Sequence, residues 1–420
     1  MLKKNRVIRM LCCMLALLAA ALVFVACGDE NGQDDGNTIT LTIWEDENNI
    51  PFVEDLLNNF ISRDYVQVYK NAPTVRFKII AQTEQRAIER LGNLGPTGNG
   101  PDVFAFVHNQ IGAAAGSKWI APAEYGDSVR AHHIQSAVDA LSLDGHLYGY
   151  PSTAECMVLM YDGSQISEQA VRSLEGINAA GKKISWQIHN DAYYSFAFLT
   201  DANLFGPGYD DQTVLKLDGT QSVENLLYLY GSNSLARRTI NSEDPDTALD
   251  SLRVGDSVGV VTTPYLWNTF KSVIEARGGT PKVAVLPTVQ VKGETVTLRP
   301  YAGYKAYGVS AFTEYPHLSQ ALAHYLSTAE SQYRRVHETH CLPTIKDSSE
   351  LDSLVASIPE AQIYKLQLQN AFAMPNIIRM EDMWAPGESA MTNLYNNNNL
   401  TRENIVSALQ SWQSTVLSKN

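Results

Sequence analysis

Cysteine is scarce in this chain, and its distribution leaves no disulfide framework. The 420-residue sequence has five cysteines, of which Cys12, Cys13 and Cys27 lie near the start and only Cys156 and Cys341 lie further on. Two cysteines so far apart cannot define a disulfide scaffold. The stability of the fold must therefore come from the burial of apolar side chains.

Motifs of common enzyme chemistry are also missing. The sequence has no G-x-S-x-G element, no phosphate-binding loop and no Cys-x-x-Cys pair. His337 and His340 are three residues apart, whereas the helical zinc motif H-E-x-x-H needs a spacing of four, so we expect no metal site. Glycoside hydrolysis stays open as the leading enzyme alternative, because it needs only two suitably placed carboxylates.

The first 26 residues have the pattern of an export signal. Four basic residues among the first nine precede an uncharged apolar stretch, residues 10–26, which is too short and wrongly flanked to span a bilayer. Residues 24–28 (FVACG) resemble the bacterial lipobox, although Phe24 replaces the usual Leu. The resemblance implies a lipid on Cys27 and anchoring at the extracytoplasmic face of the cell membrane. An ordinary secretory signal or an uncleaved anchor is the alternative.

The chain that follows the signal is acidic and long. Residues 28–37 are rich in Gly, Asp and Asn and carry no apolar side chain, so we expect a flexible tether, 27–37, behind the lipid. Without residues 1–26 the chain has 28 Lys and Arg against 45 Asp and Glu, a net charge of −17, which argues against nucleic-acid binding. The 393 residues from Gly28 onward exceed one comfortable core and predict two domains.

Alternating strand and helix signals open the mature chain. They predict strands at 39–43, 75–81 and 101–107, a helix opened by Pro51 and an amphipathic helix at 84–91. The order is βαβαβ, which favours a parallel sheet with helical crossovers.

Later segments carry further signals. Asp144-Gly145 supplies the positive φ angles of a two-residue hairpin turn within 141–148. Strands are expected at 260–262 and 283–286, a helix at 321–326, and a solvated loop at 396–399. Thr401 is expected to cap a final helix that buries Ile405, Leu409, Trp412 and Val416 on one face. No internal repeat and no second apolar span is present.

Four segments, in order, resemble maltose-binding proteins of the extracellular solute-binding family 1. They are GPDVFAFVHN at 100–109, LYGYP at 147–151 followed by Glu155 and LMYD at 159–162, YAGYKAYGV at 301–309, and MPNI at 374–377 with Met380, Trp384, Pro386 and Ala390. The resemblance runs from one end of the mature chain to the other. It implies an α/β, type II periplasmic-binding-protein-like fold, with two lobes of discontinuous sequence joined by a hinge of three crossings.

The resemblance also implies boundaries and a function. The crossings fall near Ala154, Gly303 and Leu342-Pro343, which gives an N-lobe of 38–153 plus 304–341 and a C-lobe of 154–303 plus 342–420. Such a protein closes its lobes around a solute, here a maltodextrin-like oligosaccharide, and delivers it to an ABC permease with separate ATPase subunits. We expect a monomer that needs no cofactor and has no catalytic residues.

The family's binding residues map onto eight positions of this sequence. Aromatic residues that stack on or line the sugar match Phe106, Tyr193, Tyr265 and Trp384, and hydroxyl-binding polar residues match Asn48, Asn109, Glu155 and Asp191. Aromatic faces beside carboxylates and amides suit a sugar, which has apolar C–H faces and a rim of hydroxyls. Core packing for the aromatic residues, turn or cap roles for Asn48 and Asp191, and an ion pair for Glu155 are the structural alternatives.

Several positions depart from the enteric maltose-binding pattern. Gln110 and Glu388 stand where Arg is usual, and Asn49 replaces a Lys, so strong donors to sugar oxygens are lost. These losses argue against a phosphate-bearing solute such as a glycerol phosphate, although another oligosaccharide or a sensory role for the lipoprotein remains open. Cys156 and Cys341 both fall at lobe crossings, either as two free buried thiols or as a redox-sensitive staple.

Overall fold

The structure is a computed structural model that describes residues 38–65 and 73–419, without the side chain of Asp64. The predicted export signal and tether lie outside these residues. Of the described residues, 41–65 and 77–419 belong to one compact unit, which holds every site residue discussed below. Within the described residues, no helix has the length and apolar character needed to cross a bilayer.

The first sheet is built mainly from the predicted N-lobe. Its strand order is β17-β16-β3-β1-β2. β6 also pairs with β16, on the side away from β3. The strands are β1 (Thr38–Glu45), β2 (Thr74–Ala81), β3 (Val103–Val107), β6 (Tyr150–Cys156), β16 (Tyr301–Val309) and β17 (Phe372–Ala373). β1 and β3 run parallel, with Ile43 opposite Val103, so the prediction of a parallel sheet with helical crossovers is confirmed for this pair.

Two helical segments of this part begin near the predicted positions, the one at Pro51 and the one at 84–91, whereas the helix predicted at 321–326 begins earlier, at Pro316. The helices of this part are α2 (Ile50–Asn59), η2 (Glu84–Arg86) with α4 (Ala87–Leu94), η4 (His108–Gln110), α5 (Ile111–Gly116), α6 (Gly126–His132), α7 (Gln135–Ala140), α14 (Pro316–Tyr325) and α15 (Ala329–Thr339). Pro51 stands in the first turn of α2, where its missing N–H costs nothing. The predicted hairpin is β4 (Ser142–Leu143) and β5 (His146–Leu147), with positive φ at Asp144 and Gly145.

The second sheet forms the centre of the predicted C-lobe. Its order is β11-β8-β12-β7-β13, from β7 (Val158–Asp162), β8 (Ile184–Ser185), β11 (Ile240–Asn241), β12 (Gly259–Thr262) and β13 (Pro281–Ala284). Three two-residue or three-residue hairpin pairs accompany the two sheets: β4 with β5, β9 (Asn203–Leu204) with β10 (Leu215–Lys216), and β14 (Val289–Val291) with β15 (Glu294–Val296). The prediction of two α/β lobes is confirmed.

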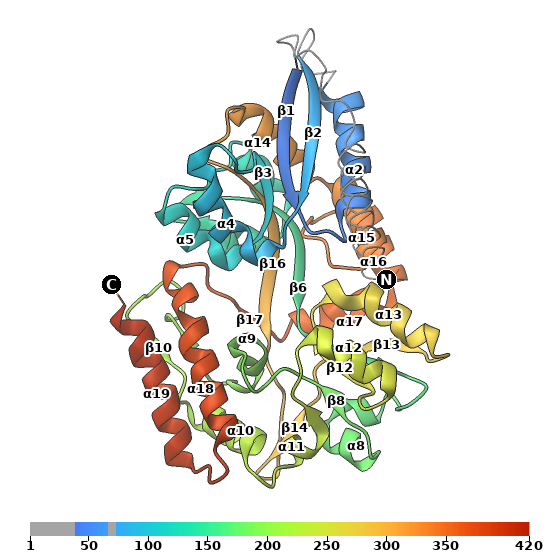
Figure 1. Cartoon of the computed structure of the whole chain (residues 1–420), viewed down its shortest axis with the longest axis vertical. Coiled ribbons are helices and arrows are strands. Elements are labelled where there is room, and N and C mark those ends of the chain that lie inside the picture. Colours follow the sequence, from blue (N-terminus) through green and yellow to red (C-terminus); the bar gives the residue numbers. More distant parts are fainter. Residues whose placement is uncertain (1–37, 66–72, 420) are drawn as a thin grey trace, which may run out of the picture. The chain divides into compact units, whose positions relative to one another are not determined.

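Helices around the second sheet complete this lobe. They are α8 (Leu174–Ala179), α9 (Ala192–Ser195), α10 (Thr220–Tyr230), α11 (Leu235–Thr239), α12 (Pro245–Val254), α13 (Trp267–Ala276), α16 (Ser349–Ser357), α17 (Pro359–Leu368), η8 (Ile378–Met383), α18 (Trp384–Asn396) and α19 (Arg402–Ser418). Thr401 caps α19 in a capping box with Asn404, and the four predicted residues of α19 are buried. α19 packs along α18 (Figure 1).

The predicted crossing points lie beside one another. β6 and β16 are antiparallel neighbours for most of their length (Figure 1), and Ala154 pairs with Tyr304. The same Ala154 forms an isolated bridge with Leu342. Three chain segments therefore pass side by side where the hinge is expected.

Candidate functional site

A hollow of about 660 Å³ lies at the hinge strands and contains most of the predicted binding residues. Six of the eight predicted positions line it: Asn109, Glu155, Asp191, Tyr193, Tyr265 and Trp384. We call this hollow the cleft. Its volume is in the range of sites that bury a small ligand.

One wall of the cleft comes from residues that follow the strands of the first sheet. Asp46 lies directly after β1, Glu84 shortly after β2, and Asn109 and Gln110 directly after β3. The carboxyl ends of parallel strands are where open α/β sheets bind ligands, because loops and helix starts gather there.

Phe106 is placed in the core rather than in the cleft. Its side chain is fully buried, packs 5.6 Å from the Phe104 ring (centroid to centroid), and lies against Gly149. β3 is a central strand, and Val107, its last residue, lines the cleft instead. In this structure Phe106 offers no surface to a ligand.

Aromatic rings form a second part of the cleft lining. Trp384 lies 6.4 Å from Tyr193 (centroid to centroid), and Tyr193 stacks at 5.9 Å on Tyr301, which stacks at 4.0 Å on Phe196. Tyr301 and Phe196 are fully buried and fix the position of the two outer rings. Tyr265 also lines the cleft and is 48% exposed, so its ring is open to contact.

Close packing positions this aromatic wall. Gly387, on α18, approaches Trp412 of α19 and Ala192 of α9 so closely that a Cβ at this position would lie 2.5–2.6 Å from their side chains. Asp191 caps α9, where its Oδ1 accepts a 2.7 Å hydrogen bond from the Tyr194 N–H. Asp191 therefore combines the cap role considered above with a place in the cleft.

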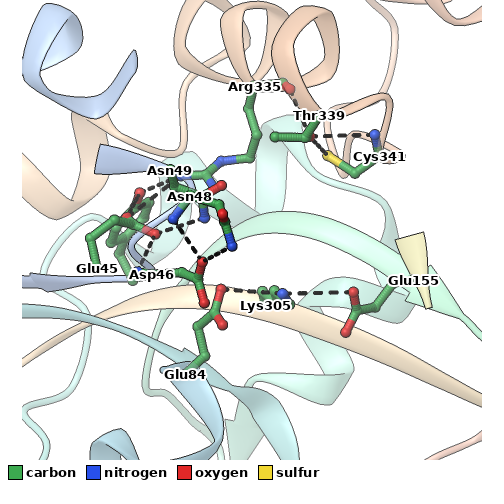
Figure 2. Close-up of polar contacts among 11 residues, drawn as sticks. Glu45, Asp46, Asn48, Asn49, Glu84, Glu155, Lys305, Arg335, Thr339 and Cys341 are labelled. Atoms are coloured by element: carbon green, nitrogen blue, oxygen red, sulfur yellow. Dashed lines mark hydrogen bonds and ion pairs between the residues drawn. The ribbon is translucent and has the colours of Figure 1, made fainter. Parts of the chain in front are cut away.

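The hinge end of the cleft holds a buried cluster of one lysine and two glutamates, which Figure 2 shows. The Lys305 ammonium lies 3.2 Å from a Glu84 oxygen and 3.8 Å from a Glu155 oxygen, and all three side chains are largely buried. Burial alone would lower the pKa of Lys305, but the adjacent Glu155 and Glu84 carboxylates raise it above its usual value. Glu155 therefore forms the ion pair that was considered as an alternative to a role in sugar binding. It also lines the cleft.

A second buried pair supports this end. The Tyr307 hydroxyl donates a 2.5 Å hydrogen bond to Glu45 and accepts one from Arg335. The Arg335 guanidinium is 3.8 Å from the Glu45 carboxylate. The Asn49 side-chain amide donates a 2.9 Å hydrogen bond to Glu45. Asn49, which stands where a Lys was expected, therefore satisfies a buried carboxylate. Figure 2 places this group beside the Lys305 cluster.

Two further hollows adjoin the cleft. One of about 380 Å³ shares Asp46, Glu155, Tyr265 and Lys305 with it, and one of about 700 Å³ shares Asp46 and Thr83. Asn48, the last of the eight predicted residues, lines both of these hollows and donates to Asp46 at 3.1 Å. The concave surface therefore extends beyond the cleft itself.

The Trp384 end of the cleft carries acids without cations. Glu381 Oε1 accepts a 3.2 Å hydrogen bond from the Asn109 amide, which links η8 to the end of β3. Burial, with a contribution from Asp382, raises the pKa of Glu381 to about 7. Burial and the nearby Glu388 raise the pKa of Asp191 to about 6, against the lowering effect of the Tyr194 hydrogen bond.

Gly112 permits the approach that brings Glu381 to this place. A Cβ on Gly112 would lie 2.2 Å from the backbone nitrogen of Ile378. The side-chain amide of Asn376 also donates to the carbonyls of Asp139, Ala140 and Ser142 at 3.3, 2.9 and 2.7 Å. These contacts fix the 376–378 segment against the first lobe.

The two cysteines of the described residues, Cys156 and Cys341, are free and buried in this structure. Cys341 Sγ accepts a 2.9 Å hydrogen bond from Thr339, and Cys156 Sγ lies 3.8 Å from the Tyr364 carbonyl oxygen. Burial raises the pKa of both thiols, which keeps them protonated. The staple is therefore not formed here. Among the described residues no group of three or more His, Cys, Asp or Glu side chains is arranged to hold a metal ion.

Sequence reasoning missed Asp46, Glu84, Lys305 and Glu381 as cleft residues. Asp46 and Glu84 follow the ends of predicted strands. Because open α/β sheets bind ligands at the carboxyl ends of their strands, this position could have indicated both residues as cleft residues. Lys305 belongs to a segment quoted for its resemblance, and on β16 it lies opposite Thr153, two residues before Glu155. Glu381 had no such signal, because its contact with Asn109 spans 272 residues.

Comparison with protein families agrees with this architecture. A family model described as bacterial extracellular solute-binding protein matches residues 64–362, more than half of the chain.

Individual proteins of known binding specificity are also similar. The galactooligosaccharide-binding protein of Bacillus subtilis (strain 168) is 24% identical over 400 residues, covering 90% of this chain and 91% of that protein. A maltodextrin-binding protein of the same organism is 22% identical over 403 residues, covering 89% and 90%. The solved structure of a maltodextrin-binding protein from L. casei BL23 superimposes with a TM-score of 0.77 at 17% identity, covering 91% of this chain and all of that one.

Proposed function

The chain belongs to the bacterial extracellular solute-binding protein family, and we propose that it captures an oligosaccharide in the cleft and delivers it to an ABC permease. The ligand class we favour is a maltodextrin-like sugar, with a galactooligosaccharide as the nearest alternative. Similar proteins are named for both kinds of ligand. Their names therefore support an oligosaccharide ligand in general more than a maltodextrin or a galactooligosaccharide in particular.

One observation carries this proposal: partly exposed aromatic rings stand next to carboxylates and an amide in one concave site. Trp384 and Tyr193 offer faces for the C–H side of a pyranose ring, and Tyr265 offers a third. Asp191, Glu155 and Asn109 lie in the same hollow and can bind hydroxyls. Asn48, in the adjoining hollows, is proposed to contact a further sugar unit of a longer ligand.

The hinge is proposed to close around this sugar. We place the lobes at 38–153 plus 304–341 and at 154–303 plus 342–420, so β6 and β16 cross between them near Ala154 and Gly303. A ligand that contacts residues of both lobes, such as Asn109 and Trp384, stabilises the closed state by the additional contacts that it makes there. Docking of the closed form on the permease then commits the sugar to import.

The remaining features follow from the sequence. We propose that residues 1–26 are removed, that Cys27 carries a lipid and that residues 27–37 tether a monomeric receptor at the extracytoplasmic face of the membrane. The receptor is proposed to be non-enzymatic, with the cleft carboxylates serving as hydrogen-bond acceptors for hydroxyls.

Isothermal titration calorimetry of residues 38–420 against a sugar panel tests the proposal. The panel contains maltose, maltotriose, maltotetraose, β-1,4-galactooligosaccharides and unrelated disaccharides. Saturable binding of an α-glucan or a galactooligosaccharide is expected, and silence across the panel would refute the sugar class. Incubation with maltoheptaose followed by product analysis is the check on catalysis, because a receptor leaves the sugar uncut and a glycosidase shortens it.

A further inference from the structure

The cleft is strongly asymmetric in charge. Its lining residues include six carboxylates, namely Asp46, Glu84, Glu155, Asp191, Glu381 and Glu388, and one cation, Lys305. The Lys305 ammonium is already engaged by Glu84 and Glu155 at the hinge end. The excess of negative charge therefore gathers at the opposite end, around Trp384.

Three carboxylates at the Trp384 end have no cationic partner. Among the described residues, no ion pair involves Asp191, Glu381 or Glu388. The hydrogen bonds that two of them accept come from neutral groups, the Tyr194 N–H and the Asn109 amide. Neutral donors satisfy lone pairs but leave the negative charge uncompensated in a partly buried site.

A second observation in the same cleft also indicates a missing donor. Gln110, which is nine-tenths buried, lines the cleft next to Asn109. Its Nε2 donates a 2.5 Å hydrogen bond to the Gln85 carbonyl, while its Oε1 is buried without a hydrogen-bond partner. A buried acceptor left unsatisfied is costly, and a ligand that brings donors into the cleft would lower this cost.

The aromatic wall adds to this preference. Trp384 and Tyr193 stand beside the three carboxylates and line the same cleft. A cation over an aromatic face is attracted by the negative face of the ring, and Trp attracts it most strongly. Carboxylates together with aromatic faces suit an ammonium group better than a hydroxyl, since a hydroxyl supplies one donor and no charge.

We propose that the Trp384 end of the cleft binds a sugar unit that carries a protonated amine, so that the ligand is an amino-group-containing oligosaccharide. This inference rests on the proposed capture of an oligosaccharide and specifies its chemistry. The ammonium lies among Asp191, Glu381 and Glu388, and the hinge end of the cleft takes a neutral part of the same ligand. Sugars with carboxylate or phosphate groups are excluded by the same charges.

The test compares pairs of trisaccharides that differ in the exchange of amine for hydroxyl. The pairs are glucosamine trimer with cellotriose, maltotriose with its 6-amino-6-deoxy form, and β-1,4-galactotriose with its 6-amino-6-deoxy form. Calorimetry on residues 38–420 at pH 7 and about 50 mM salt gives the affinity ratio within each pair. For at least one pair we expect the amine member to bind at least tenfold more tightly, and the ratio to shrink as salt is raised.

A variant separates the charge effect from general damage to the site. Glu388→Gln removes one carboxylate that is exposed at the cleft and that forms no hydrogen bond or ion pair within the described part of the chain. We expect it to reduce the amine-to-hydroxyl ratio at least threefold. Glu350→Gln makes the same exchange at an exposed position of α16 and should keep the wild-type ratio. Thermal unfolding of both variants verifies that they are folded.

The outcomes are distinct. Equal binding within each pair, or preference for the neutral member, overturns the amine proposal and leaves oligosaccharide capture intact. An unchanged ratio in Glu388→Gln also overturns it. Failure of every member of every pair, together with silence of the neutral sugar panel, contradicts the proposed function itself.

Discussion

The two ends of the cleft differ in whether their carboxylates are paired with cations. At the hinge end, Glu84 and Glu155 share the Lys305 ammonium, and the neighbouring Glu45 is paired with Arg335. At the Trp384 end, Glu381 and its neighbours lie beside aromatic rings without a cation. A buried charge that is already paired holds strands together, whereas an unpaired one at an accessible surface is a place for a ligand to bind.

The largest effect is expected when the hinge end is broken. Lys305→Met leaves Glu84 and Glu155 buried without their cation, which should lower the free energy of unfolding by about 3–5 kcal/mol. Chemical denaturation at pH 7.5 measures the loss. Lys292→Met is the matched control, because Lys292 is 63% exposed and its partner Glu224 keeps an ion pair with Arg402. A loss below 1 kcal/mol at Lys305 would show that the cluster does not stabilise the fold.

A histidine beside the hinge should make stability depend on pH. His108 is fully buried, its Nδ1 accepts a hydrogen bond from the Tyr304 N–H at 3.1 Å, and its Nε2 lies 2.9 Å from the Met374 carbonyl oxygen. Burial lowers the pKa of His108 from 6.5 to about 4, because the hydrogen bond to the Met374 carbonyl, which favours the charged ring, does not offset desolvation.

The unfolded chain therefore binds the proton at a higher pH than the folded protein does. The His108 contribution is complete above pH 6.5 and is lost as the pH falls toward 4, by roughly 3 kcal/mol. His108→Gln should flatten the dependence of the unfolding free energy on pH over this window. His146→Gln, at an exposed position, should keep the wild-type slope. A wild-type slope in the His108 variant would contradict the assignment.

The Trp384 end should show the opposite dependence. The pKa of Glu381 is raised from 4.5 to about 7, so the folded protein holds this proton more tightly than the unfolded chain. Its contribution is present below pH 4.5 and is lost as the pH rises through 7. Glu381→Gln should therefore raise the free energy of unfolding by about 1–2 kcal/mol at pH 8 and by less at pH 5. Denaturation of the variant at both pH values is the measurement, and equal or lower stability at pH 8 would be the contrary result.

The smallest effect is expected at Tyr265, which lines both the cleft and the adjoining 380 Å³ hollow. Because its ring is 48% exposed, Tyr265→Ala should leave the unfolding free energy nearly unchanged. Loss of one stacking face should weaken sugar binding by about 1 kcal/mol, or roughly fivefold. Calorimetry with the tightest sugar of the panel measures this. Unaltered affinity would contradict stacking of the sugar on Tyr265 and would leave Trp384 as the nearer aromatic contact.

Much of the fold could be predicted because its signals are local. The capping box at Thr401, the Asp144-Gly145 turn and the proline at the start of α2 each act within a few residues of sequence. The positions of Trp384 and Tyr193 in one cleft came from resemblance, since nothing local joins residues of α9 and α18.

The remaining site residues depend on distant contacts. The Tyr307–Glu45 hydrogen bond spans 262 residues and the Asn109–Glu381 bond spans 272, so no periodicity in the sequence could indicate them. Phe106 shows a different limit. All but the last residue of β3 are buried, so alternation of residue types could not tell which aromatic side chain would face the cleft.

The most direct test of the account compares the affinity of Trp384→Ala with that of Trp119→Ala for the tightest sugar of the panel, by calorimetry at pH 7. Both tryptophans are partly buried, but only Trp384 lines the cleft, whereas Trp119 packs on Gly92. We predict that Trp384→Ala weakens binding at least thirtyfold, about 2 kcal/mol, while Trp119→Ala retains wild-type affinity. Equal affinity of the two variants would contradict the claim that the cleft captures the sugar on its aromatic wall.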